Sequence, residues 1–205
     1  MGFYSRVIFP RVLDFVMYND EMREARTAVL TDVSGDVFEI GFGTGLNLPH
    51  YPPAIKKITT ADVNPAMGKR ARRRIDKYGI EVDCRTLDAE SLPFDDASFD
   101  SVVCTWTLCS IKDPMKALGE LRRILRPRGR FFFVEHGLAD DPKVQRIQNR
   151  LTPWWKHIGD GCHLNRNARE LIQDAHFTFD KLDTYYMEKA PRFAGYMYQG
   201  VATKS

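Results

Sequence analysis

The sequence lacks several features that would narrow its class at once. Its four cysteines, Cys84, Cys104, Cys109 and Cys162, form no Cys-x-x-Cys pair, and no secretory signal is present. This pattern is not that of a disulfide-stapled domain and is typical of a reducing compartment, so we expect a cytoplasmic protein with free thiols. No uninterrupted apolar run reaches the about 20 residues needed to cross a bilayer.

A strong charge of either sign is also missing. The net charge of +3 over 205 residues is too small to indicate nucleic acid by itself, and we expect no such partner. One helix, over residues 64–78, is strongly basic, which we interpret as a solvated outer face. The alternative for that helix is an anionic partner, either a phospholipid surface or nucleic acid.

Repeats, low-complexity segments and linkers are absent too, which predicts a single domain over residues 1–205 with a helical cap over residues 1–30. Residues 3–17 are unusually apolar but are interrupted by Arg6, Pro10, Arg11 and Asp14. We expect short helices that cover the core or act as a lid over the site. The alternative is peripheral contact with a membrane through residues 3–17, with the arginines toward lipid headgroups.

Strand and helix patterns alternate through most of the chain. Five strands are predicted at 37–40, 56–62, 80–85, 99–106 and 130–135, with helices between them that begin at Asn64-Pro65 and at Asp113-Pro114. Pro127 and Gly129 are expected to stop the second of these helices. Two β-rich runs, 177–187 and 196–203, follow without a helix between them. The prediction is an α/β protein with a doubly wound, Rossmann-like, mostly parallel seven-stranded sheet whose last strand is antiparallel.

A glycine-rich turn follows the first strand directly. Gly41, Gly43 and Gly45 leave bare peptide N–H groups for a ligand. In an open α/β sheet the ligand lies outside the carboxyl ends of the strands, where Asp62, Asp88-Ala89, Thr105-Trp106 and Glu135-His136 also fall. This row suits a nucleoside, carried by a dinucleotide or by S-adenosylmethionine. The spacing is not the Gly-x-Gly-x-x-Gly of dinucleotide sites, and no phosphate-binding lysine follows it.

These motifs together resemble the class I S-adenosylmethionine-dependent methyltransferases of the type 11 sort. Residues 39–45 resemble their first motif, Asp62 their ribose-binding acid, and residues 88–94 with 98–100 their third-strand signature. Residues 125–130 are similar to the stretch before their fifth strand, with Arg128 where a glycine is common. The resemblance covers residues 35–137 and implies S-adenosylmethionine as cofactor and S-adenosylhomocysteine as product. The cofactor-binding residues it implies are Glu39, Gly41, Gly43, Thr44, Gly45, Asp62, Val63, Asn64, Asp88, Ala89, Glu90, Thr105 and Trp106.

The methyl acceptor is predicted from the segments around this core. Residues 104–110 lack the Asn-Pro-Pro-Tyr type of motif of members that methylate nucleic-acid bases or glutamine. Residues 135–137, 151–156 and 160–164 are similar to a subgroup of thiol S-methyltransferases and, more distantly, phospholipid N-methyltransferases. We therefore expect S-methylation of a small thiol or sulfide. The alternatives are N-methylation of a phospholipid headgroup at a membrane surface, another small-molecule methylation, or a cofactor-binding module without catalysis.

A thiol acceptor needs a group that removes its proton, because its pKa is about 8.5. His136 and His163 are the candidate bases, with Asp160 or Glu135 to orient them. Cys109, Trp154, Trp155 and Cys162 are candidate pocket residues. The alternative for His163 is that it caps the helix that starts near residues 165–167. The alternative for Trp154 and Trp155 is that they simply pack in the core. Cys162 and His163 lack further ligands at usable spacing, so no metal site is predicted.

Overall fold

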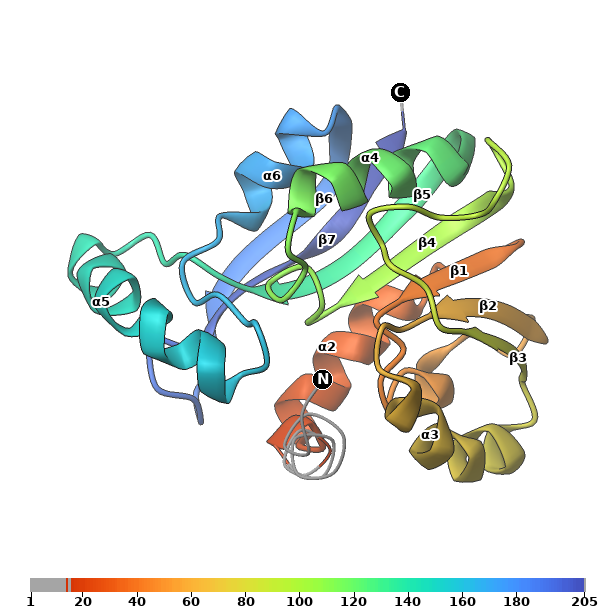
Figure 1. Cartoon of the computed structure of the whole chain (residues 1–205), viewed down its shortest axis with the longest axis horizontal. Coiled ribbons are helices and arrows are strands. Elements are labelled where there is room, and N and C mark those ends of the chain that lie inside the picture. Colours follow the sequence, from red (N-terminus) through yellow and green to blue (C-terminus); the bar gives the residue numbers. More distant parts are fainter. Residues whose placement is uncertain (1–13, 15, 205) are drawn as a thin grey trace.

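The computed structural model of the chain describes residue 14 and residues 16–204. Its centre is a seven-stranded sheet in the order β3-β2-β1-β4-β5-β7-β6 (Figure 1). The strands are β1 (Val37–Ile40), β2 (Lys57–Ala61), β3 (Glu81–Arg85), β4 (Phe99–Thr105), β5 (Leu125–His136), β6 (Phe177–Tyr186) and β7 (Tyr196–Lys204). Strands β1 to β5 pair in parallel, and β7 runs antiparallel to both β5 and β6. The predicted fold class is confirmed.

Helices cover both faces of this sheet. They are α2 (Asp20–Leu30), α3 (Pro65–Tyr78), α4 (Pro114–Ile124), α5 (Pro142–Ile158) and α6 (Ala168–Asp174), with a short 3-10 helix, η2, at Leu48–His50. Figure 1 shows α4 and α6 over one face and α2 and α3 near the other, while α5 lies beyond one end of the strands. This alternation of strand and helix is what places the ends of β1, β2, β4 and β5 at a common edge.

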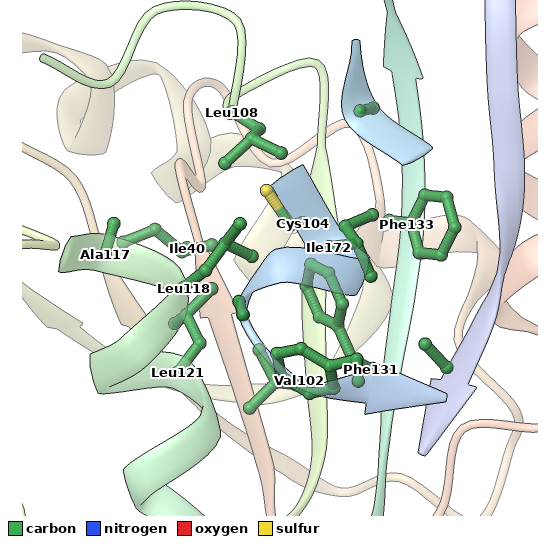
Figure 2. Close-up of a cluster of buried hydrophobic side chains, with 14 of the residues drawn as sticks. Ile40, Val102, Cys104, Leu108, Ala117, Leu118, Leu121, Phe131, Phe133 and Ile172 are labelled. Atoms are coloured by element: carbon green, nitrogen blue, oxygen red, sulfur yellow. The ribbon is translucent and has the colours of Figure 1, made fainter. Parts of the chain in front are cut away.

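The core consists of two apolar layers, one on each face of the sheet. In β5, Phe131 and Phe133 pack into the layer under α4 and α6, whereas Phe132 and Val134 pack into the layer under α2. Figure 2 shows the first layer, in which Leu118, Leu121 and Ile172 reach toward the strands. Successive side chains of a strand point to opposite faces, so a strand covered on both sides reads as a continuous apolar run.

Helix starts follow capping chemistry where it was expected. The Asp113 side chain accepts a hydrogen bond from the backbone N–H of Lys116 and so begins α4. Helix α6 is capped by Asn167, which accepts from the N–H of Glu170. His163 therefore does not cap that helix, and this interpretation was wrong.

The expectation that Pro127 and Gly129 stop a helix was also wrong. Helix α4 ends at Ile124, and Pro127 and Gly129 lie inside β5, where residues 126–129 bulge opposite Asp100. A proline tolerates this extended, locally unpaired backbone. Helix α5, which was not among the predicted helices, runs for 17 residues and contains Pro153. One missing N–H leaves the other hydrogen bonds of such a long helix in place.

Only part of the N-terminal segment is among the described residues. Residues 1–13 and 15 lie outside the described residues, and with them most of the predicted lid or membrane contact at 3–17. Helix α2 is the described part of the predicted cap, and its buried face carries Met22, Ala25, Arg26 and Val29. Within the described residues, no helix combines the length and the apolar character that a membrane span requires.

Candidate active site

A large cavity opens at the carboxyl ends of β1, β2, β4 and β5. Its volume is about 890 Å³, at the upper end of the usual range for small-molecule sites. Ile40, Ala61, Thr105 and His136, which end the four strands, all line it. The cavity therefore has room for a nucleoside-sized cofactor together with a small second molecule.

The glycine loop forms one wall of this cavity. Gly41 has a φ of +73°, and a Cβ atom added there would lie 1.9 Å from Oγ1 of Thr107, so only glycine fits. Gly43 and Thr44 line the cavity as predicted. Gly45 is not among the lining residues; its φ is +76° and it packs closely against Leu48, Phe42 and Ala71. Its role is to let the loop approach α3, not to touch a ligand.

Asp62, at the end of β2, is held in a fixed orientation. Its Oδ2 accepts a hydrogen bond of 2.9 Å from the N–H of Gly43, and its Oδ1 accepts one of 2.7 Å from the N–H of Asn64. Burial raises the pKa of this carboxyl, while the two N–H donors act in the opposite direction. Each oxygen keeps a further lone pair toward the cavity, which suits the two hydroxyls of a ribose.

A buried polar network lies beneath the loop and starts from Glu39. Its carboxylate accepts from Nδ2 of Asn47 at 2.9 Å and from the hydroxyl of Tyr51 at 2.7 Å. Burial raises the pKa of Glu39 to about 7. Arg26 donates from Nε to Oδ1 of Asn47, and its guanidinium lies 4.6 Å from the centre of the Trp106 ring. The network ties helix α2 to the cofactor side of the cavity.

Arg26 and Asn47 line the cavity and were missed at the sequence level. A signal for Arg26 was available: it stands at helical spacing among Met22, Ala25 and Val29, on the face of α2 that faces the core. A charged residue there needs polar partners, which Asn47 and the carbonyl groups of Met17 and Met22 supply. Nothing local in the sequence pointed to Asn47.

Cys109, His136 and Cys162, which also line the cavity, form a cluster. Each offers one ligand or hydrogen-bonding atom, and these atoms all lie within 4.8 Å of one another. Nε2 of His136 is 3.0 Å from Sγ of Cys162, which also accepts a 3.3 Å hydrogen bond from Nε1 of Trp155. Nδ1 of His136 is buried and has no hydrogen-bond partner among the described residues. We call these three residues the Cys–His–Cys cluster.

The cluster shifts the acidity of its own members. A hydrogen bond from the Cys162 thiol, aided by the nearby His136, holds the pKa of Cys109 well below its usual range despite burial. Donating that hydrogen bond, together with burial, raises the pKa of Cys162. Burial, the largest single influence, lowers the pKa of His136, but the charge of Cys109, a hydrogen bond to Cys109 and the charge of Glu135 together raise it, and the net direction is upward.

Glu135 fixes the position of the loop that carries Cys109. Its side chain accepts hydrogen bonds from the backbone N–H groups of Thr107 at 2.7 Å, Leu108 at 2.9 Å and Cys109 at 3.4 Å. Burial raises the pKa of Glu135 to about 8, and the nearby charge on Cys109 acts in the same direction. Glu135 does not line the cavity, so its part is to position the loop.

The remaining predicted residues divide into two groups. Asp160 and Trp155 line the cavity, as do Glu39, Val63, Asn64, Asp88, Ala89, Glu90 and Trp106. His163 and Trp154 do not. Nδ1 of His163 lies 3.2 Å from the carbonyl oxygen of Cys109, and Trp154 is 75% exposed. Adjacent helical residues point about 100° apart, so Trp155 faces the cavity and Trp154 faces away.

The comparisons with known proteins agree with this geometry. The family model described as "Methyltransferase domain" matches residues 38–133. Thiol S-methyltransferase TMT1A of Homo sapiens is 33% identical over 179 residues, which cover 82% of this chain and 73% of that protein. The chain belongs to the class I S-adenosylmethionine-dependent methyltransferases. S-adenosylmethionine is accordingly the cofactor of this methyltransferase, and the glycine loop and Asp62 are placed to hold it.

Two further relatives and one solved structure are similar to this methyltransferase. Thiol S-methyltransferase TMT1B of Rattus norvegicus is 39% identical over 155 residues, 72% of this chain and 62% of the relative. Phosphatidylethanolamine N-methyltransferase of Cereibacter sphaeroides is 29% identical over 147 residues, 71% of this chain and 72% of the relative. The chain thus spans less than two thirds of the TMT1B relative.

The solved structure is the putative methyltransferase in complex with the Haloferax volcanii Trm112 methyltransferase activator. It superposes with a TM-score of 0.75 at 19% identity and covers 98% of this chain and 96% of that one. At this identity the likeness supports the fold alone.

Proposed function

We propose that this methyltransferase transfers the methyl group of S-adenosylmethionine to the sulfur of a small thiol or sulfide. The observation that carries the proposal is the Cys–His–Cys cluster on the wall of the same cavity that the glycine loop lines. A thiol reacts as its thiolate, and this cluster is the group of ionisable side chains placed to help the acceptor lose its proton. Two thiol S-methyltransferases among the relatives support the same acceptor class.

The reaction itself is a direct transfer. The acceptor sulfur forms a bond to the methyl carbon while the bond from that carbon to the sulfonium breaks, and its electron pair stays on neutral S-adenosylhomocysteine. The thiol proton leaves to the cluster or to solvent. Holding the two sulfur atoms in line with the methyl group supplies up to about 7–11 kcal/mol of the barrier reduction. Trp106 and Trp155 on the cavity wall exclude water and present aromatic surface to the sulfonium.

The second candidate is N-methylation of a phospholipid headgroup, and a specific observation favours it. Val16 and Ile158 line the cavity yet are 52% and 63% exposed, and Trp154 nearby on α5 is 75% exposed. Apolar side chains of this kind at a cavity mouth suit contact with a lipid surface. One relative is named for phosphatidylethanolamine N-methylation.

An acceptor panel decides between the two. The full chain is mixed with S-adenosylmethionine and, separately, with sulfide, methanethiol, longer alkyl thiols or phosphatidylethanolamine liposomes. S-adenosylhomocysteine is quantified and the methylated product is confirmed by mass. Turnover on thiols alone supports the proposal. Turnover on liposomes alone overturns it in favour of the second candidate, and binding of cofactor with no turnover on any acceptor contradicts both.

A further inference from the structure

The Cys–His–Cys cluster is assembled from three separate parts of the chain. Cys109 lies in the loop after β4, His136 ends β5, and Cys162 follows α5. In the sequence, Cys162 has His163 as its neighbour, and that pair alone lacks enough ligands for a metal ion. The fold instead turns His163 toward the backbone of Cys109 and brings Cys162 to His136. Two thiols and one imidazole are a donor set that suits Zn²⁺.

The number of ligands and their exposure fit a catalytic rather than a structural zinc site. Structural sites close a tetrahedron with four protein ligands, whereas catalytic sites use three and leave the fourth position open. Cys109, His136 and Cys162 all line the cavity, so the fourth position would face the space left for the acceptor. Among the described residues, the cluster has no fourth cysteine, histidine or carboxylate.

The distances need only a small adjustment to hold an ion. Nε2 of His136 and Sγ of Cys162 are 3.0 Å apart. Around a tetrahedral zinc ion, with Zn–S of about 2.3 Å and Zn–N of about 2.0 Å, these atoms would be about 3.5 Å apart. A rotation of either side chain supplies this difference. The cluster is thus close to the required geometry without a change in the backbone.

Neighbouring groups already orient two of the three ligands. Nε1 of Trp155 donates to Sγ of Cys162, and Glu135 accepts the backbone N–H of Cys109. Hydrogen bonds of this kind are what holds ligands in place around metal ions in proteins. Helix α5 therefore contributes a supporting donor, and β5 contributes one ligand and the residue that positions another.

We propose that Cys109, His136 and Cys162 bind a zinc ion whose fourth position takes the sulfur of the methyl acceptor. Coordination of a thiol to zinc deprotonates it, and the proton leaves to solvent. The zinc-bound sulfur then forms its bond to the methyl carbon as the carbon–sulfonium bond breaks. The product is an uncharged thioether, a weaker ligand than a thiolate, and it dissociates. The acceptor part of this proposal rests on the proposed function; the metal-binding part does not.

The first test is the metal content of the full chain, produced without a histidine tag and kept reduced. Mass spectrometry of the dialysed protein is expected to find about one zinc ion per chain. Cys109→Ser and Cys162→Ser are expected to reduce this content at least tenfold, because losing even a residue that only supports a ligand costs about 10–100-fold in metal affinity. Cys84→Ser, at an exposed cysteine on β3 outside the cavity, is the matched control and keeps the zinc. Retained S-adenosylhomocysteine binding shows that each variant is folded.

The second test replaces zinc by Co²⁺ and needs no turnover. Thiolate ligands give cobalt a charge-transfer absorption band, which the wild-type chain should show and the Cys109→Ser/Cys162→Ser double variant should lack. Methanethiol added in the presence of S-adenosylhomocysteine is then expected to change the cobalt spectrum, since a new sulfur ligand enters the open position.

The outcomes separate the two proposals. Absence of zinc and of a cobalt–thiolate band overturns the metal site, even if thiols are methylated. Bound metal with a spectrum unaffected by methanethiol overturns the acceptor role and leaves a structural ion. Bound metal that responds to methanethiol, in a chain that methylates only liposomes, supports the site and contradicts the proposed function.

Discussion

Two parts of the cavity wall are built in different ways: the glycine loop with Asp62, called the cofactor end, and the Cys–His–Cys cluster proposed to face the acceptor, called the acceptor end. The cofactor end uses backbone N–H groups and a few carboxylates that follow directly on β1 and β2, such as the glycine loop and Asp62. The acceptor end gathers side chains that are far apart in the sequence, from residue 109 to residue 162. The comparison teaches that binding of a common cofactor resides in local motifs, whereas the choice of acceptor depends on tertiary contacts.

The largest effect is expected from a change that affects the acceptor end alone. His136→Ala removes the imidazole of the Cys–His–Cys cluster, and we expect turnover on methanethiol to fall by about 10²-fold or more. Affinity for S-adenosylhomocysteine, measured by calorimetry, should change only slightly. His157→Ala, on the exposed side of α5, is the matched control. Undiminished turnover of His136→Ala would contradict a role for this imidazole in methylation of the acceptor.

The reverse experiment affects the cofactor end alone. Asp62→Ala removes the carboxylate expected to accept hydrogen bonds from the ribose hydroxyls. Since a hydrogen bond to a charged group contributes about 1.5–3 kcal/mol, we expect cofactor affinity to fall by about 10²-fold. Asp95→Ala, at an exposed turn outside the cavity, should bind normally in the same calorimetric titration. Equal affinities for the two variants would contradict the placement of the ribose.

A third prediction concerns the pH dependence of stability at the cofactor end. The pKa of Glu39 is about 7 in the folded chain and about 4.3 in the unfolded one. Between these values the folded state keeps a proton that the unfolded state loses, so this group makes the free energy of unfolding decrease as pH rises. The decrease is on the order of 3 kcal/mol and ends near the folded pKa.

Glu39→Gln cannot lose a proton and should remove this part of the dependence. Denaturant unfolding at about pH 5, 6, 7 and 8 measures it, without cofactor and with reductant. The groups that face Glu39 are Arg26, Asp62 and Tyr51, and they remain in the variant. Identical pH profiles for the two proteins would show that Glu39 is ionised throughout.

The smallest effect is expected from substitutions of the neighbouring residues Trp154 and Trp155 in α5, only one of which lines the cavity. Trp154→Phe changes a side chain that is 75% exposed, and we expect stability within about 0.5 kcal/mol of wild type and unchanged thiol turnover. Trp155→Phe keeps the aromatic wall but removes the N–H donor to Cys162, and we expect turnover to fall severalfold. Parallel assays on methanethiol distinguish the two variants. Equal turnover would show that the hydrogen bond from Trp155 to Cys162 does not contribute to methylation of the thiol.

The sequence predicted the sheet, the cofactor and most of the cofactor wall because these depend on neighbouring residues. Strand β5 is an apolar run that can only be buried on both faces, and Gly41 is the residue that the turn requires. Trp154 was wrongly placed in the cavity because the helix through Pro153, which turns this side chain outward, was not predicted. His163 lies after that helix and is turned toward the carbonyl group of Cys109, a contact between distant parts of the chain. Arg26 was missed because its partner Asn47 is 21 residues away in the sequence.

The Cys–His–Cys cluster could not be predicted from the sequence, because its three residues are far apart along the chain. Cys162 was compared with its neighbour His163, and only the fold shows that its partners are Cys109 and His136. Nothing in the spacing of these three residues indicates that they meet.

The strand order has a consequence for how the chain is made. Strand β7 lies between β5 and β6, and His136 is paired with Met197. Strands β1 to β4 and the glycine loop precede β5 on the growing chain, and N-terminal parts fold first during synthesis. The cofactor end can therefore assemble early, while the strand that braces His136 is inserted only after residue 204 has been made. The glycine loop is therefore made, and can fold, before the strand pairing that holds His136 is complete.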